Sequence, residues 1–159
     1  MRTFLITLGL SVLLVNGLAL LAQSPVLRPP GTFKSAAQVA AELDKSVSTL
    51  GLVAGQSVAI VPELVIRRRQ AGPNNASVHT ADGDGQDVTE VYEIVDGAGT
   101  LMTGGTLPDP KDRTAGIKGG EAHRVAKGDF IVIPAGTPHW FSRIEGSITY
   151  VETRFPTKK

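Results

Sequence analysis

The chain has 159 residues, of which 42% are hydrophobic and 19% are charged, and its net charge is +1 at pH 7. This composition is that of a globular domain with short appendages, and it excludes a disordered chain. Without Arg2, basic and acidic residues are equal in number at 15 each, so charge gives no reason to expect a nucleic-acid partner. Cysteine is absent, which excludes disulfides, thiolate metal ligands and a cysteine nucleophile.

Residues 1–22 are predicted to be a secretory signal peptide. Arg2 precedes an uncharged, apolar stretch from Thr3 to Ala22, the arrangement typical of such signals. The signal would direct the domain to the periplasm or the medium, with cleavage expected after Ala22. The alternative is an uncleaved anchor, because about 18 apolar residues just span a bilayer. Only in that case would a membrane be a partner.

Residues 23–34 are predicted to be a linker, because they contain three prolines and a glycine. Residues 35–51 are predicted to form one amphipathic helix. Ser35 and Gln38 have the spacing of a capping box, in which each side chain bonds the backbone of the other. Apolar side chains follow at helical spacing, and a glycine then ends the helix: Val39, Leu43, Val47, Leu50 and Gly51.

Residues 52–159 are predicted to be all-β, because short apolar runs alternate with Gly and Pro turns. The expected strands are Gln56–Ile60, Leu64–Arg69, Ala76–Thr80, Glu90–Val95, Thr100–Thr103, His123–Val125, Phe130–Ile133, His139–Ser142 and Ile148–Phe155. Two long loops, Ala81–Asp87 and Thr106–Gly120, separate some of them. The run Arg67-Arg68-Arg69 is interpreted as a solvated strand edge.

The segment Gly128–His139 has a glycine, five residues, Pro134, one residue, Gly136, two residues and then His139. It predicts a turn, an apolar strand, a reversal at Gly136 and a histidine at the start of the next strand. This spacing resembles the second conserved motif of the cupin superfamily. Glu90 and Gly97 match the second half of the first cupin motif.

The first half of that first motif departs from the family pattern. Ser77 replaces its first histidine, and ten residues rather than three or four separate His79 from Glu90. The resemblance implies a double-stranded β-helix, a jelly-roll barrel with the helix packed outside. It also implies a homodimer, which would cover exposed sheet edges and outer apolar faces.

Cupins that bind metal use imidazoles and one carboxylate at the barrel mouth, so the resemblance implies His79, Glu90 and His139 as ligands. This set suits Fe, Mn, Ni, Cu or Zn. Tyr92 and Ile94 share the strand face of Glu90, and an inward carboxylate among apolar residues needs a partner. For each histidine the alternative is an ordinary structural or surface residue. The further candidates for the ligand pocket are Tyr92, Phe130, Phe141 and His123.

Two functions follow from the resemblance, because similar barrels host enzymes and binders alike. The first is an exported cupin that holds a divalent metal and acts on or binds a small organic molecule. If it is an enzyme, the expected types are oxygenase, isomerase and lyase. The second is a non-catalytic binding or sensing module without metal. Ser77 in place of a ligand histidine favours the second, and the pair of Glu90 and His139 favours the first.

Overall fold

The computed structural model describes residues 28–50, 56–72, 77–80 and 88–157. The expected signal segment, residues 1–22, and the loop 81–87 lie outside the described residues. Residues 31–159 form one compact unit, and residues 28–30 belong to a separate N-terminal unit. Within the described ranges, no helix is long and apolar enough to span a bilayer.

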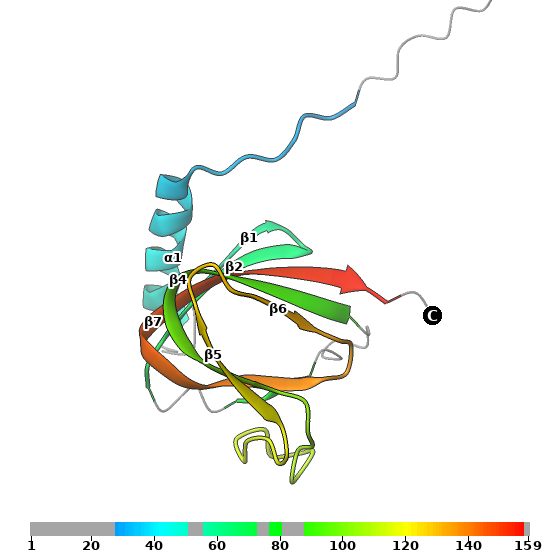
Figure 1. Cartoon of the computed structure of the whole chain (residues 1–159). Helices are drawn as coiled ribbons and strands as arrows, with labels where there is room; N and C mark the ends of the chain where they lie inside the picture. The colour runs from blue at the N-terminus through cyan, green and yellow to red at the C-terminus, as the bar shows by residue number, and fades with distance from the viewer. Residues whose placement is uncertain (1–27, 51–55, 73–76, 81–87, 158–159) are drawn as a thin grey trace, which may run out of the picture. The chain divides into compact units, whose positions relative to one another are not determined.

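The predicted all-β architecture with one N-terminal helix is confirmed. The elements are α1 (Ala36–Leu50), β1 (Gln56–Val61), β2 (Leu64–Gln70), β3 (His79–Thr80), β4 (Val88–Thr103), β5 (Glu121–Ala126), β6 (Phe130–Ile133) and β7 (Pro138–Pro156). All strand pairs are antiparallel, in the order β1-β2-β7-β4-β5. In addition, β3 pairs with β7 and β6 with β4. The sheet curls into a barrel-like shape (Figure 1).

In two places, two successive strands expected from the sequence form one long strand. The residues expected to form Glu90–Val95 and Thr100–Thr103 lie in β4, and β7 likewise joins the two expected C-terminal strands. Gly97 lies between the two expected segments, at an irregularity of the pairing with β7 through which β4 continues. Its φ is 76°, and a Cβ there would lie 2.0 Å from the Ser147 carbonyl oxygen. A glycine is therefore required at this close approach of β4 and β7.

The predicted capping box begins α1. The Ser35 N–H donates to Gln38 Oε1 at 2.8 Å, and the Gln38 N–H donates to Ser35 Oγ at 3.2 Å. Leu43 is 2% exposed, and α1 contacts β1 and β2. Burying this leucine anchors the helix to the sheet. Asp44 on the same helix accepts a hydrogen bond from Arg68 at 2.9 Å.

The apolar core fills one end of the barrel. Its members come from four strands, chiefly β4 and β7: Tyr92, Ile94, Leu101, Val125, Ile133, Phe141, Ile144, Ile148 and Tyr150. Ile133, Ile148 and Tyr150 have no exposed surface. Along β4 the buried residues alternate with more exposed ones, as expected where one face of a sheet is covered, whereas Ile148, Thr149 and Tyr150 of β7 are all buried.

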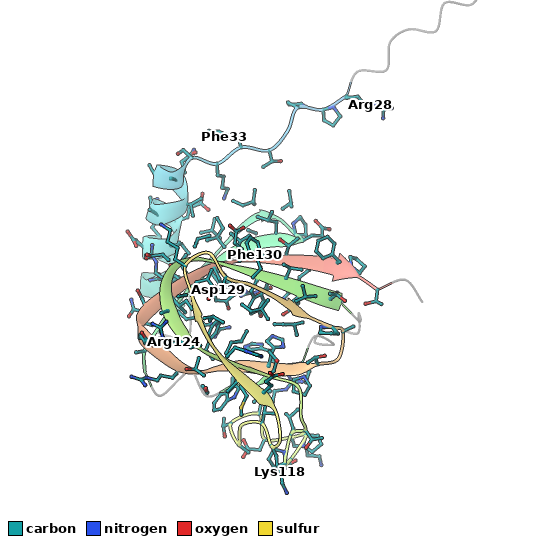
Figure 2. The ribbon with its side chains drawn as sticks, in the orientation of Figure 1. Arg28, Phe33, Lys118, Arg124, Asp129 and Phe130 are labelled. Carbon is teal, nitrogen blue, oxygen red and sulfur yellow. The ribbon has the colours of Figure 1, made fainter. Side chains whose placement is uncertain are left out.

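Outside the barrel, Phe130 and Val132 on β6 are 65% and 63% exposed. Figure 2 labels Phe130 on this strand. Phe155 on β7 is 53% exposed. Exposed apolar side chains of this size are compatible with an interface between subunits. Homodimer formation stays a prediction, and light scattering at micromolar concentration would test it.

Candidate functional site

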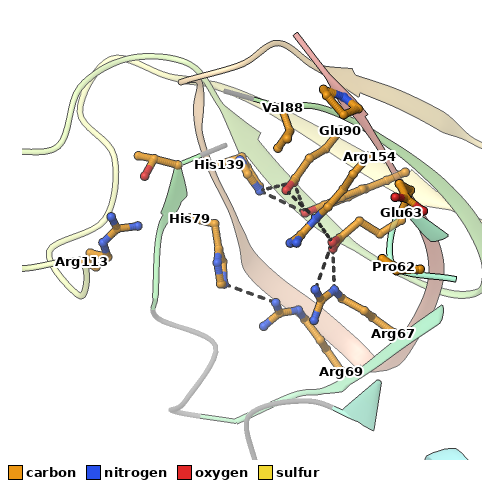
Figure 3. Close-up of a pocket in the computed structure, with 14 residues that line it drawn as sticks. Pro62, Glu63, Arg67, Arg69, His79, Val88, Glu90, Arg113, His139 and Arg154 are labelled. Carbon is orange, nitrogen blue, oxygen red and sulfur yellow. Dashed lines mark hydrogen bonds and ion pairs between the residues drawn. The ribbon is translucent and has the colours of Figure 1, made fainter. Parts of the chain in front are cut away.

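A pocket of about 480 Å³ lies at the other end of the barrel from the apolar core. Charged and hydroxyl-bearing side chains make up most of its wall (Figure 3). The lining residues are Pro62, Glu63, Arg67, Arg69, His79, Thr80, Val88, Glu90, Tyr92, Arg113, His139, Glu152, Arg154 and Pro156. A volume of this size suits a small organic molecule.

The predicted motif places His139 as expected. β6 ends at Ile133, and the Thr137 N–H donates to the Pro134 carbonyl at 3.1 Å to close the turn. Gly136 has a φ of 75°, which only glycine adopts without strain. The chain thereby reverses and presents His139 to the pocket with 2% exposure.

His139 forms a buried cluster with Glu90 and Tyr92. The Tyr92 hydroxyl donates to Glu90 Oε2 at 2.9 Å and lies 3.0 Å from His139 Nε2, which is 3.2 Å from Glu90 Oε2. His139 Nδ1 lies 3.0 Å from the Thr137 carbonyl oxygen, an acceptor, so we assign a proton to Nδ1. Burial alone would raise the pKa of Glu90, but His139, Tyr92 and Arg154 lower it overall.

A second cluster joins Glu152 to two arginines. Arg67 donates to both carboxylate oxygens of Glu152 through Nε and Nη2, the latter at 3.0 Å. Arg154 Nε lies 2.8 Å from Glu152 Oε1 and 3.4 Å from Glu90 Oε1. Burial would lower the Arg67 pKa, but Glu152 raises it overall. The bidentate pairing fixes the Arg67 and Glu152 side chains, so the pocket wall is preorganised.

His79 and Arg69 lie on the side of the pocket away from Glu63 (Figure 3). In β3, His79 pairs with His139 of β7, and the two rings lie 5.9 Å apart between centroids. Arg69 Nη2 is 3.4 Å from His79 Nε2, and Arg69 Nε donates to the Tyr150 hydroxyl at 2.9 Å. Burial, then Arg69, His139 and Arg67, lower the pKa of His79 to about 4. Its imidazole is therefore neutral at pH 7.

The three predicted metal ligands, His79, Glu90 and His139, thus share one pocket. Their donor atoms are engaged with protein groups: His139 Nε2 faces Glu90 and Tyr92, and His79 Nε2 faces Arg69. The described part of the chain contains no group of three or more His, Asp or Glu side chains arranged to hold a metal. As arranged, their donor atoms face protein groups and not one shared position, and metal binding stays a prediction.

Of the four further residues predicted for the pocket, two lie inside the barrel and two lie away from the pocket. Tyr92 lines the pocket, and Phe141 lies in the core, with its ring 6.5 Å from that of Tyr92. Phe130 and His123 are not brought to the pocket. Phe130 faces outward, because Ile131 and Ile133 occupy the inward positions of β6. The His123 side chain is 52% exposed and lies 3.3 Å from Glu121.

A second, small cavity of about 10 Å³ lies between the pocket and the core. Arg69, His79, Tyr92, His139 and Trp140 are among its lining residues. The indole nitrogen of Trp140 is buried without a hydrogen-bond partner in the described structure. The volume is about that of one water molecule, so the pocket wall packs closely against the core.

Sequence reasoning missed the ionic wall of the pocket. The interpretation of Arg67-Arg68-Arg69 as a solvated edge is wrong for two of the three residues. Arg67 and Arg69 line the pocket, whereas Arg68 contacts α1 through Asp44. Alternation along the strand was the available signal, since residues two apart share a face. Nothing in the sequence spacing pointed to Glu152 or Arg154.

Neither a scan against family models nor a search of curated proteins gives a match. Among solved structures, the Drosophila melanogaster CENP-C cupin domain is 16% identical over 59% of this chain and 61% of that chain, with a TM-score of 0.43. Hydroxypropylphosphonic acid epoxidase from S. wedmorenis is 16% identical over 64% of this chain and 49% of that chain, with a TM-score of 0.43. A crystal structure of FeII HppE is 16% identical over 64% of this chain and 50% of that chain, with a TM-score of 0.44.

The matched region therefore spans about half to three fifths of the length of these structures. The first of them is a cupin domain. In this chain the antiparallel sheet curls around the pocket, and the Gly136 turn presents His139 to it.

Proposed function

We propose that this cupin-type barrel binds a small organic molecule in the pocket at its mouth. The observation that carries the proposal is a pocket of about 480 Å³ whose polar wall is held in place by interactions within the protein. Preorganised groups lose little conformational freedom when a ligand arrives, which favours binding. The proposal concerns binding and assigns no reaction.

The walls offer both kinds of contact that a small molecule needs. Val88, Pro62 and Pro156 supply apolar surface, and Tyr92, Arg69 and His79 supply hydrogen-bonding groups. A few polar groups on a partly apolar wall fix the orientation of a bound molecule. This combination supports the non-catalytic binding function more directly than the metal-dependent one.

Filling the pocket tests the proposal. A panel of small organic molecules of different charge is screened by thermal unfolding, since a ligand of the folded state raises the melting temperature. We expect some members to stabilise the wild type and Val88→Phe to lose the effect. Val132→Phe adds the same ring on the exposed outer face and is the matched control. The proposal would be contradicted if no member of the panel stabilises the wild type. It would also be contradicted if Val88→Phe and Val132→Phe are stabilised equally.

A metal-bound form is the second candidate. It is favoured by the convergence of His79, Glu90 and His139 on one pocket, and these residues would hold the ion. A bound divalent metal would supply Lewis-acid or redox chemistry there. Metal analysis of the purified protein tests it. Near-stoichiometric Fe, Mn, Ni, Cu or Zn that is lost in Glu90→Ala would support this candidate over the first.

A further inference from the structure

The buried part of the pocket wall contains charges that balance one another. Arg67 Nη2 donates to Glu152 Oε1 at 3.0 Å, and Arg154 Nε lies 2.8 Å from the same oxygen. Arg154 Nε also lies 3.4 Å from Glu90 Oε1. These two arginines and two glutamates have no net charge together, so a ligand meets little net field from this cluster.

Arg113 lines one side of the pocket, in the loop between β4 and β5, and is exposed to solvent. Its carbonyl accepts a hydrogen bond from the Val78 N–H at 2.8 Å, and its Nη1 donates to the Val78 carbonyl at 3.4 Å. These contacts hold the residue beside β3. Among the described residues, no carboxylate lies within ion-pair distance of Arg113. Its charge can therefore act on a ligand.

Glu63 lines the opposite side of the pocket, in the turn between β1 and β2 (Figure 3). Its carbonyl accepts a hydrogen bond from the Arg154 N–H at 2.7 Å, which holds the turn against β7. Glu63 is exposed, and no basic side chain in the described part of the chain lies within ion-pair distance of its carboxylate. The pocket thus has a positive group on one side and a negative group on the other.

We propose that the pocket binds an elongated zwitterion, with the anionic group of the ligand at Arg113 and its cationic group at Glu63. This inference rests on the proposed binding function and adds the charge pattern of the ligand. A guanidinium donates hydrogen bonds to an anionic group, and a carboxylate accepts them from an ammonium group. The uncharged middle of the ligand would lie over the charge-balanced part of the wall. Amino acids and short peptides are the class of molecule with this pattern.

A set of probes with nearly the same length and shape separates the two charges. δ-Aminovalerate is the zwitterion, hexanoate has only the anionic group, δ-aminovaleramide has only the cationic group, and hexanamide has neither. Isothermal titration calorimetry measures their binding at low ionic strength, because salt screens charges at an open pocket. We expect each charge to tighten binding about threefold, the effect of one solvent-exposed ion pair, and both together about tenfold. A second set with longer chains varies the separation of the charges.

Two variants assign each charge of the ligand to one residue. Arg113→Gln should remove the preference for an anionic group and keep the preference for a cationic one, and Glu63→Gln should do the reverse. Both residues are exposed, so neither substitution changes the barrel interior. Arg143→Gln and Glu121→Gln remove the same charges at exposed positions of β7 and β5 that do not line the pocket. These matched controls should leave both preferences unchanged.

The opposite responses of the two pocket variants would support the zwitterion inference. Equal affinity for the zwitterion and the neutral amide in both sets of probes would overturn it and leave the binding function standing. Equal losses in the pocket variants and their controls would overturn it as well. If no probe binds while a member of the broader panel stabilises the wild type, the inference is wrong and the binding function stands. If the panel also fails, both are wrong.

Discussion

The two ends of the barrel are built from the same strands, yet one is a dry apolar core and the other an ionic pocket. Inward positions follow the same order on both central strands: Glu90, Tyr92 and Ile94 on β4, and Glu152, Tyr150 and Ile148 on β7. The isoleucines lie in the core and the glutamates line the pocket. On each strand the core isoleucine and the pocket glutamate are therefore four residues apart, with a tyrosine midway between them.

A layer of two tyrosines separates the two ends. The rings of Tyr92 and Tyr150 lie 4.6 Å apart and belong to the apolar core. Their hydroxyls instead bond polar residues, Glu90 and Arg69. A tyrosine suits this place because its ring is apolar and its hydroxyl is polar. The comparison teaches that a single side-chain type can join a core to a site without leaving a buried polar group unsatisfied.

The largest loss of stability is expected from a substitution in the apolar core. Ile148→Ala should lower the free energy of unfolding by about 2–5 kcal/mol, because Ile148 is fully buried and its truncation leaves a cavity. Urea unfolding measures this loss. Val132→Ala truncates an exposed apolar residue of β6 and should change stability by less than about 0.5 kcal/mol. Equal losses in the two variants would contradict the assignment of the core.

At the pocket end, Glu152→Gln should cost about 1–3 kcal/mol, because it leaves Arg67 and Arg154 without their shared carboxylate. Glu145→Gln breaks a pair with Arg124 at the surface, where solvent screens the charges, and should cost less than Glu152→Gln. Urea unfolding of both variants gives the difference. If Glu152→Gln is neutral, the ionic wall does not stabilise the fold.

Glu90 and His139 should be energetically coupled, since their side chains lie 3.2 Å apart and share Tyr92. A double-mutant cycle of Glu90→Gln and His139→Ala should give a coupling energy of about 0.5–3 kcal/mol. Unfolding with and without a chelator separates the two candidate functions. A coupling that persists in the chelator comes from the protein cluster alone. One that disappears indicates a shared metal.

The smallest effect on stability is expected from the titration of His79, because part of this residue meets solvent at the pocket edge and solvent screens its charge. Its pKa falls from 6.5 to about 4 on folding, so between these values the unfolded chain binds a proton that the folded chain does not. The free energy of unfolding should therefore rise with pH across this window. Melting temperatures of His79→Asn should depend less steeply on pH than those of the wild type. An unchanged slope would contradict the lowered pKa.

The sequence predicted those parts of the molecule that depend on local rules. Spacing within residues 128–139 located β6, the Gly136 turn and the buried His139, and the Ser35–Gln38 pair located the start of α1. Local rules did not show that β4 continues past Gly97, because the close approach of β7 that requires this glycine is a tertiary contact.

The charged wall of the pocket could be predicted only if it were known which face of each strand turns inward. A shift of one residue exchanges the two faces of a strand, so the run Arg67-Arg68-Arg69 alone does not show which arginines enter the pocket. The same ambiguity placed Phe130 in the predicted pocket, although Ile131 and Ile133 are the inward residues. The pairing of Glu152 with Arg67 joins strands far apart in sequence, and no local pattern encodes it.

The position of Trp140 gives the protein a built-in optical probe. It is the only tryptophan in the chain, and it lines the small cavity together with His79 and His139. Indole emission depends on the polarity and packing around the ring, so a molecule that enters the neighbouring pocket and shifts His139 would change the colour or intensity of that emission. The unmodified chain can thus report on its own occupancy, with no label and no second tryptophan to obscure the signal.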